Sequence, residues 1–206
     1  DIEEFLKLPF LGVIPRIQEV ALKTRNGYSP DRDLYIVKNP KSAVAECARS
    51  VRTNLIFMGT DKPLHRLLLT SAGPAEGKTT PAVSLGTTMA QAGNKVLLVD
   101  TDLRKPRLHR SFGVSGEVGL TSCLLDQDRI PDAIKSTQVV GLDLLPRGPL
   151  PPNPAELMHS DKFRELLDRL AEDYGRIIMD SPPIGAVTDA AILSKWVDGS
   201  ILVVQA

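Results

Sequence analysis

TSAGPAEGKTT, residues 70–80, follows directly on three leucines at positions 67–69. An apolar strand followed by a short loop that ends in Gly-Lys-Thr is typical of a phosphate-binding loop between a strand and a helix. The backbone N–H groups of such a loop turn inward around phosphates, and the following helix points its positive end at them. We expect Lys78 to add a positive charge and the hydroxyl of Thr79 to ligate Mg²⁺. The predicted phosphate contacts come from eight consecutive residues: Gly73, Pro74, Ala75, Glu76, Gly77, Lys78, Thr79 and Thr80.

Two further apolar segments end in aspartate. KVLLVDTDLRKPRLH, which begins at residue 95, carries Asp100 and Asp102, and RIIMDSPP, which begins at residue 176, carries Asp180. Side chains two positions apart on a strand point the same way, so Asp100 and Asp102 are expected to face one site. Open parallel sheets bind ligands just outside the carboxyl ends of their strands. The loop and both acidic strand ends therefore converge on one predicted crevice.

Three carboxylates in one crevice repel one another unless a cation lies among them. The Mg²⁺ ion of a bound nucleotide is the natural cation for such a site. We accordingly predict Thr79, Asp100, Asp102 and Asp180 as the residues around the metal. Taken singly, Asp100 or Asp102 would be interpreted as a helix cap or a turn residue, and the phosphate loop together with Asp180 favours the site.

Apolar runs rich in Val, Ile and Leu alternate with helical patterns along the chain. Strands are expected near residues 66–71, 95–100, 142–146, 175–180 and 199–204, and helices near residues 41–58, 78–92, 119–126, 160–173 and 187–196. Continuous apolar strands that alternate with helices indicate an α/β fold, whose mostly parallel sheet is covered by helices on both faces. Together with the phosphate loop, this pattern predicts a fold of the P-loop NTPase type.

Composition limits the classes of partner. A chain of 206 residues, 42% of them hydrophobic, suits one domain with a sizeable core. Its 25 basic and 25 acidic residues balance, and aromatic residues make up only 4%, so we expect no nucleic-acid partner. Cys47 and Cys123 have no C-x-x-C spacing, which fits a reducing compartment. No apolar stretch approaches the roughly 18–20 residues that span a bilayer.

The order GPAEGKTT, VLLVDTDLRKP and IIMDSPP resembles the bacterial tyrosine kinases that accompany polysaccharide polymerisation and export. Residues 73–80, 96–106 and 177–183 are similar to the family's first, modified second and third Walker motifs. The second acidic strand is the diagnostic piece, because ordinary phosphate-loop ATPases lack it. The resemblance implies that ATP and Mg²⁺ are used to phosphorylate tyrosine. It also implies that Lys78, Asp100, Asp102 and Asp180 are catalytic.

Flanking segments extend the resemblance over nearly the whole chain. ECARSVRTNL, residues 46–55, resembles the family's E-x-x-R-x-x-R helix through Glu46, Arg49 and Arg52. The resemblance implies that this helix docks on a neighbouring copy in a ring, although three charges at this spacing also fit a solvated helix face. GPLPPNPAELM, residues 148–158, resembles the family's proline-rich segment.

The segment LPFLGVIPRI, residues 8–17, resembles the tail of the chain-length-regulator domain that precedes the kinase. We therefore expect residues 1–40 to form a linker and residues 41–206 to form the kinase domain, incomplete at its C-terminus. The resemblance further implies a location at the cytoplasmic face of the inner membrane. The implied partners are the regulator domain, a tyrosine-rich tail of a neighbouring copy and a protein-tyrosine phosphatase.

Two residues depart from the family pattern. Ala75 stands where the family has glycine, and it is strained if the backbone there has a positive φ. Pro81 is expected to delete an early hydrogen bond of the helix that follows the loop. Both departures keep open an alternative in which the protein is a catalytically silent, nucleotide-binding scaffold that sets polysaccharide length.

Another alternative is an ATPase of the partition or septum-site type. Its loop carries a signature lysine before the glycines, and Gly73 occupies that position here, which weakens this interpretation. A nucleic-acid-binding module is a more distant alternative, and the balanced charge speaks against it.

Overall fold

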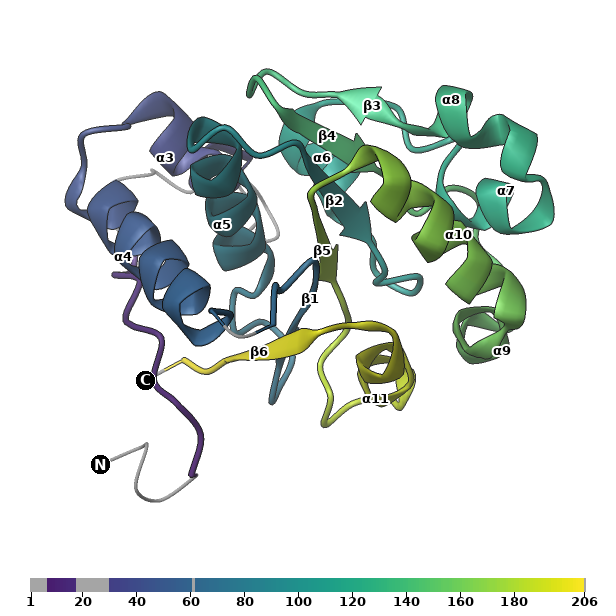
Figure 1. Cartoon of the computed structure of the whole chain (residues 1–206). Coiled ribbons are helices and arrows are strands. Elements are labelled where there is room, and N and C mark those ends of the chain that lie inside the picture. Colours follow the sequence, from purple (N-terminus) through teal and green to yellow (C-terminus); the bar gives the residue numbers. More distant parts are fainter. Residues whose placement is uncertain (1–6, 18–29, 61, 206) are drawn as a thin grey trace.

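The computed structural model describes residues 7–17, 30–60 and 62–205. Its centre is a six-stranded sheet with the order β3-β4-β2-β5-β1-β6 (Figure 1). All neighbouring strands pair in parallel except β3 and β4, which pair antiparallel. The strands are β1 (Arg66–Ser71), β2 (Val96–Asp100), β3 (Lys135–Ser136), β4 (Leu142–Leu145), β5 (Arg176–Asp180) and β6 (Gly199–Val203).

The inner strands are apolar along their length because helices cover both faces of the sheet. Every residue of β2 is buried, and only the first residue of β1 and of β5 is partly exposed. The edge strand β6 instead alternates between half-buried and exposed residues. The three buried strands β1, β2 and β5 lie next to one another in the middle of the sheet and carry the predicted site at their carboxyl ends.

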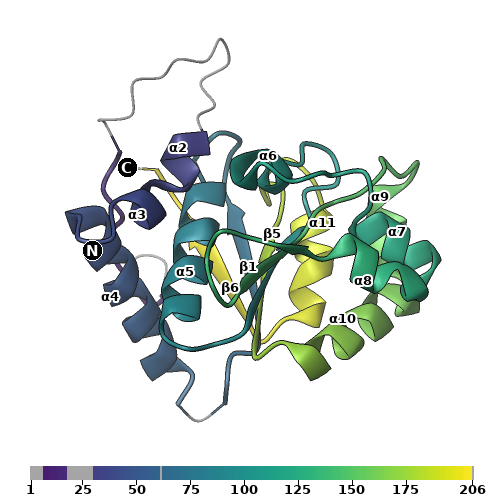
Figure 2. The ribbon, with the colours of Figure 1, turned by 90° about the horizontal axis from the view of Figure 1, so that it is seen from above.

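One face of the sheet is covered by the helices that surround the phosphate loop (Figure 2). They are α2 (Pro30–Asp33), α3 (Tyr35–Lys38), α4 (Ala43–Met58), α5 (Thr79–Gln91) and α6 (Leu108–Phe112). The helix α5 packs directly on β2 and β5, and α4 packs on α5 from outside. Ser42 begins α4, because its side chain accepts a hydrogen bond from the N–H of Ala45.

The other face is covered by helices from the C-terminal half of the chain. They are α7 (Leu120–Leu125), α8 (Ile130–Ala133), α9 (Pro154–His159), α10 (Asp161–Asp173) and α11 (Asp189–Leu193), with short 3-10 helices at Gln127–Arg129 and Ser194–Trp196. The amphipathic α10 turns Phe163, Leu166, Leu167 and Leu170 toward the sheet. The two buried clusters, one on each face, form the core.

The predicted α/β class with a mostly parallel, doubly covered sheet is confirmed. All five expected strands and all five expected helices are present at nearly the expected bounds. The elements that the sequence did not predict are short: β3 has two residues, the 3-10 helix Gln127–Arg129 has three, α2, α3 and α8 have four each, α6 has five and α9 has six. Elements of this length are too short to show a period of 2 or 3.6 residues.

The segment expected to be a linker is packed against the domain wherever the structure describes it. Residues 30–38 form α2 and α3, which contact α5. Residues 7–17 run beside α4, where Asn54 donates a hydrogen bond to the backbone oxygen of Leu11. The rest of the expected linker, residues 1–6 and 18–29, lies outside the described residues. The domain boundary at residue 40 therefore stays a prediction, and residues 30–38 are treated below with the site.

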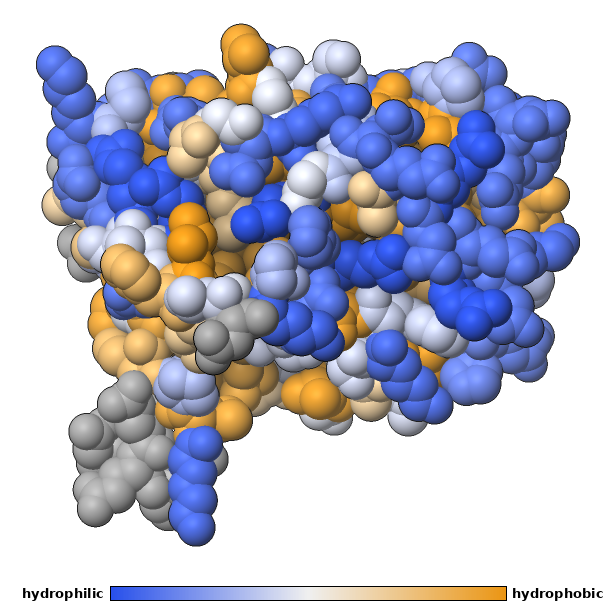
Figure 3. All heavy atoms as spheres, in the orientation of Figure 1, coloured by the Kyte–Doolittle hydropathy of each residue, from blue (hydrophilic) through white to orange (hydrophobic). Residues whose placement is uncertain are grey.

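Apolar side chains are exposed where residues 7–17 pass the end of α4, an area at the lower left of Figure 3. The exposed residues there are Leu8, Phe10, Val13, Ile56, Phe57 and Met58. Within the described residues, no helix has the length and hydropathy needed to cross a membrane.

Candidate active site

The loop between β1 and α5 takes the turn that the sequence predicts. Gly77 has a φ of 81° and Ala75 a φ of 67°, both in the left-handed region. Glycine adopts this region freely, whereas alanine is strained in it. The strain expected at Ala75 is therefore present. Ser71 closes the start of the loop by donating its hydroxyl to the backbone oxygen of Gly73 at 2.8 Å.

The expected effect of Pro81 is wrong. The helix α5 begins at Thr79 after the cap residue Lys78, so Pro81 is its third residue. The N–H groups of the first turn have no partner within a helix, so a proline there deletes no helical bond. The next residue, Ala82, already donates to the backbone oxygen of Lys78 at 3.1 Å. The departure at Pro81 is thus compatible with a regular α5.

The structure brings the loop lysine and two of the predicted aspartates together. Nζ of Lys78 lies 3.3 Å from Oδ2 of Asp102 and 3.9 Å from Oδ1 of Asp180. The hydroxyl of Thr79 donates to Oδ2 of Asp180 at 2.8 Å. These contacts follow from the parallel register, since Asp180 at the end of β5 pairs with Asp100 of β2 and with Leu69 of β1.

Asp100 lies behind this group, at the buried end of β2. Its Oδ2 accepts hydrogen bonds from the backbone N–H groups of Arg107 at 2.9 Å and Leu108 at 3.0 Å. Burial, and then the negative charge of Asp180, raise the pKa of Asp100 to about 8. Asp102 is held differently, because its Oδ1 accepts from the N–H of Lys105 at 2.9 Å while its other oxygen faces Lys78.

Asp180 is also buried, and burial raises its pKa to about 6. The charge of Lys78 and the hydrogen bond from Thr79 oppose this rise, whereas the charge of Asp102 adds to it. Oδ1 of Asp100 and Oδ1 of Asp180 are both buried and accept no hydrogen bond from the described residues. A cation lowers the free energy of two buried carboxylate oxygens that have no hydrogen-bond donor.

The donor set fits Mg²⁺ bound together with a nucleotide. Among the described residues, no cluster of three or more His, Cys, Asp or Glu side chains is arranged to hold a metal ion alone. Protein sites for Mg²⁺ commonly supply only one or two carboxylates, and phosphate oxygens and water complete the octahedron. The hydroxyl of Thr79 and Oδ1 of Asp180, which has no hydrogen-bond donor among the described residues, meet this requirement.

A buried carboxylate outside the predicted motifs also joins the site. Asp33, at the end of α2, accepts hydrogen bonds from Thr80 of the loop at 2.7 Å and from Ser111 of α6 at 2.6 Å. Arg107 donates to the same carboxylate at 3.0 Å. Sequence reasoning missed Asp33 because it stands 47 positions from Thr80, in a segment with no periodicity and no recognisable spacing. The basic residue Arg104 points elsewhere and pairs with Asp189.

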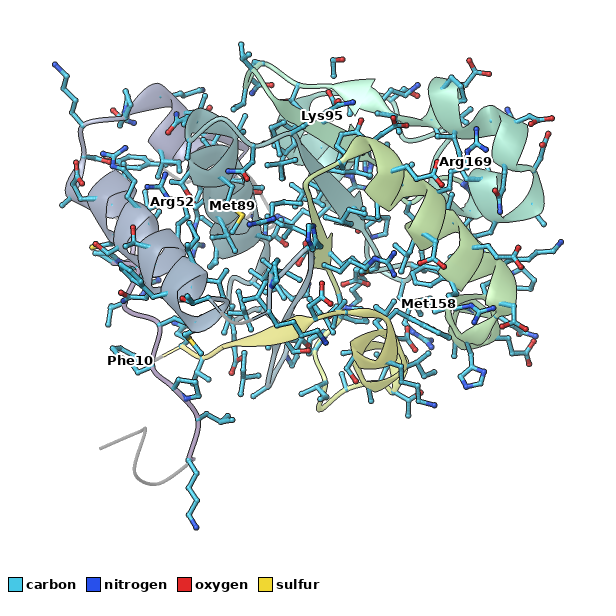
Figure 4. The ribbon with its side chains drawn as sticks, in the orientation of Figure 1. Phe10, Arg52, Met89, Lys95, Met158 and Arg169 are labelled. Atoms are coloured by element: carbon cyan, nitrogen blue, oxygen red, sulfur yellow. The ribbon has the colours of Figure 1, made fainter. Side chains whose placement is uncertain are left out.

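Glu46, Arg49 and Arg52, which are predicted to lie at an interface between copies, all form contacts within this chain. Arg49 pairs with Glu46 at 2.7 Å and also donates to the backbone oxygen of Pro40. Arg52 turns inward and donates to the backbone oxygen of Thr88 in α5 at 2.8 Å. Figure 4 shows Arg52 beside Met89, in the space between the two helices. Glu46 remains exposed.

Comparison with known proteins points to one group. A family model described as an AAA domain matches residues 73–206, beginning inside the phosphate loop. The tyrosine-protein kinase YwqD of Bacillus subtilis (strain 168) is 42% identical over 186 residues, which cover 90% of this chain and 78% of YwqD. The crystal structure of the chimerical protein CapA2B2 has a TM-score of 0.87 at 37% identity and covers 98% of this chain and 82% of that chain.

A septum-site protein is similar over a smaller part of the chain. The septum site-determining protein MinD of Pyrococcus horikoshii OT3, in complex with Mg-ADP, has a TM-score of 0.56 at 28% identity. The match covers 68% of this chain and 57% of MinD. The two proteins share the nucleotide-binding fold. YwqD exceeds MinD in identity and coverage, and CapA2B2 exceeds it in identity, coverage and TM-score.

The raised pKa of Asp100 predicts how stability depends on pH. Its folded-state pKa of about 8 exceeds the ordinary value of 3.8, so the folded state binds the proton more tightly than the unfolded chain does. The resulting stability is complete below pH 4 and is lost as the pH rises to about 8. An asparagine in this position can still accept both backbone N–H groups and carries no charge.

We therefore expect Asp100→Asn to raise the melting temperature of the nucleotide-free protein by about 3–6 °C at pH 8.5, and by much less at pH 5. Thermal unfolding in EDTA measures the difference, with the exposed Asp132→Asn as the control. A variant that gains equally at both pH values, or loses stability at pH 8.5, would contradict this account.

The left-handed φ of Ala75 predicts that Ala75→Gly stabilises the protein by about 0.5–1 kcal/mol, because relief of strain exceeds the added flexibility of the unfolded chain. Urea unfolding measures the change. Ala72→Gly is the matched control, since Ala72 lies in the same loop without a positive φ and should gain nothing. Equal or opposite effects of the two substitutions would show that the strain at Ala75 is not real.

Proposed function

The chain belongs to the bacterial tyrosine-protein kinases, and on that premise we propose that it transfers the γ-phosphoryl group of ATP to the hydroxyl of a protein tyrosine. The observation that carries the proposal is the placement of Lys78 between Asp102 and Asp180, on a phosphate loop and at the ends of β2 and β5. A P-loop ATPase needs the phosphate loop and one strand that ends in an acidic residue, which is β5 with Asp180 here. The acidic end of β2 adds Asp102, a further carboxylate beside Lys78.

In the proposed mechanism, positioning and electrostatics provide most of the catalysis. Lys78 and the loop N–H groups stabilise the charge on the β- and γ-phosphates. Thr79 and Asp180 hold Mg²⁺ or order its water ligands. When bound, the metal neutralises part of the phosphate charge. The lysine turns from Asp102 and Asp180 to the phosphates when the nucleotide binds, and this releases an oxygen of Asp102.

We assign the base-like role to Asp102 rather than to Asp100. A phenol with a pKa near 10 needs an acceptor for its proton at neutral pH. Both hydrogen bonds from Arg107 and Leu108 go to one oxygen of Asp100, which fixes this residue at the buried end of β2. Asp102 keeps one oxygen toward the crevice and is the more exposed of the two. Asp100 and Asp180 would then both order the water ligands of the metal.

We further propose that the acceptor tyrosines lie in the tyrosine-rich tail of a neighbouring copy and that the copies form a ring. The helix α4 supplies the contact, with Glu46 and Arg49 at the surface and Arg52 fixing α4 on α5. A membrane-bound chain-length-regulator domain, in the same chain or in another, would place the kinase at the cytoplasmic face of the inner membrane. Export of exopolysaccharide or capsule is the proposed process, and a protein-tyrosine phosphatase would reverse the reaction.

One observation favours a second candidate function. The strained Ala75 lies in the loop that would hold the phosphates, and backbone strain in this loop would weaken nucleotide binding. A protein that binds nucleotide weakly and transfers nothing would be an oligomeric scaffold that controls chain length.

Phosphotransfer distinguishes the two functions. The purified chain is incubated with γ-labelled ATP, Mg²⁺ and a tyrosine-bearing acceptor peptide, and phosphoamino acids are then analysed. We expect phosphotyrosine, a loss of at least about 100-fold in Lys78→Met, and a comparable loss in Asp102→Asn. Arg169→Met, at an exposed position of α10, is the control. Nucleotide binding without phosphotyrosine would support the scaffold, and labelled serine or threonine would contradict the assignment.

The α4 contact is tested by exchanging the charges of its ion pair. Glu46→Lys combined with Arg49→Glu keeps a pair within the helix but reverses the charges that a neighbouring copy meets. We expect the mass in solution at high concentration, measured by light scattering, to fall from an oligomer to a monomer. Asp161→Lys with Arg164→Glu is the matched control, because this pair has the same spacing on α10. An unchanged mass, or a wild-type chain that stays monomeric, would exclude this interface.

A further inference from the structure

The helix α2 is fixed over the phosphate loop by a fully buried carboxylate. Asp33 accepts hydrogen bonds from Thr80 and Ser111, and it forms an ion pair with Arg107. These three donors belong to α5, to α6 and to the segment that follows Asp102. A buried carboxylate with three donors has few other positions of comparable energy, so the residue before it is held in place as well.

That preceding residue, Arg32, turns its guanidinium toward the loop. A methyl group placed on Gly77 would lie 3.6 Å from Nη2 of Arg32, which is an ordinary van der Waals contact. The loop glycine just before Lys78 and the guanidinium therefore face each other. The side chain is half-buried, and its Nε is buried without a hydrogen-bond partner among the described residues.

Lys78, Arg104 and Arg107 each form an ion pair near the loop, whereas Arg32 forms none with a described residue. Lys78 pairs with Asp102 and Asp180, and Arg107 pairs with Asp33. Arg104 pairs with Asp189. No ion pair or hydrogen bond joins Arg32 to another described residue. A buried guanidinium nitrogen without a hydrogen-bond partner lowers the stability of the fold. We therefore expect an anion to bind beside Arg32 on this side of the loop.

We infer that Arg32 is a further nucleotide-binding residue, which contacts the phosphates of ATP from the side of α2. The inference rests on the proposed function, because the anion in question is the nucleotide that the loop holds. Phosphate fits the guanidinium better than a base or ribose does, since the planar fork of arginine donates two parallel hydrogen bonds to phosphate oxygens. The N–H groups of the loop converge on phosphates at the same place.

The assignment gives α2 a role in the site. The residues of the Walker motifs lie between positions 73 and 183, whereas Arg32 comes from a segment more than 40 residues before the loop. Asp33 is then a positioning residue, which holds α2 on Thr80 and so holds Arg32 at the loop. Displacement of α2 would withdraw a positive charge from the nucleotide without altering Lys78, Thr79 or the acidic strand ends.

The test compares ligand affinities of the wild-type chain and Arg32→Ala, measured by calorimetry with Mg²⁺ for ATP and ADP, and for adenosine. We expect the dissociation constants for ATP and ADP to rise by about 10- to 100-fold and that for adenosine to stay within about twofold. Arg32→Lys should recover part of the affinity, because it keeps the charge but not the fork. Arg164→Ala, on the far helix α10, is the control.

Thermal unfolding of the nucleotide-free variants separates binding from folding. Arg32 has no ion-pair or hydrogen-bond partner among the described residues, so Arg32→Ala and the polar, uncharged Arg32→Gln should melt within about 2 °C of the wild type. Unchanged affinity for ATP in folded Arg32→Ala overturns the inference but leaves the proposed function intact. An equal loss for adenosine also overturns it, because the contact is then with the nucleoside. A wild-type chain that binds no ATP overturns both.

Discussion

The contact of one ammonium with two carboxylates organises this molecule. Nζ of Lys78 lies between Asp102 and Asp180. Lys78 comes from the loop before α5, Asp102 from the segment after β2 and Asp180 from the end of β5. The contact requires that β1, β2 and β5 lie side by side in parallel, because only then do their carboxyl ends share one edge. The doubly covered sheet, the buried strands and the helix layers on both faces supply that arrangement. The fold thus holds the side chains of Lys78, Asp102 and Asp180 within contact distance of one another.

The same arrangement is unfavourable when the site holds no nucleotide. Asp100 and Asp180 are buried at neighbouring strand ends, and each has one oxygen without a hydrogen-bond donor among the described residues. Their pKa values rise because the charged forms are poorly solvated. Ala75 adds backbone strain in the adjoining loop. Local destabilisation of this kind is expected at sites that bind a charged ligand, since ligand and metal relieve it. The hydrophobic clusters on both faces of the sheet offset this cost in the unliganded protein.

Much of the fold and the centre of the site could be predicted from the sequence. The β1, β2 and β5 segments are continuous apolar runs, and their terminal aspartates converge because parallel strands end at one edge. Other features could not be predicted. Asp33 and Arg32 belong to a four-residue helix with no periodic signal, and their place over the loop depends on tertiary packing. The expected effect of Pro81 was wrong because the helix starts one residue after Lys78, and boundaries are the least certain part of such a prediction. The inward turn of Arg52 toward Thr88 was equally hidden, since its spacing with Glu46 and Arg49 describes only their own helix.

The phosphate loop and the acidic strand ends together form one site for a nucleotide and its metal. The most direct measurement is the melting temperature of the wild-type chain at pH 8 with ATP alone, with Mg²⁺ alone and with both. We expect ATP and Mg²⁺ together to stabilise the protein by more than the sum of the separate shifts, and by about 2.7 kcal/mol at a ligand concentration 100 times the dissociation constant. Shifts that merely add, or no shift with both ligands present, would show that the loop and the acidic strand ends do not form one site for nucleotide and metal.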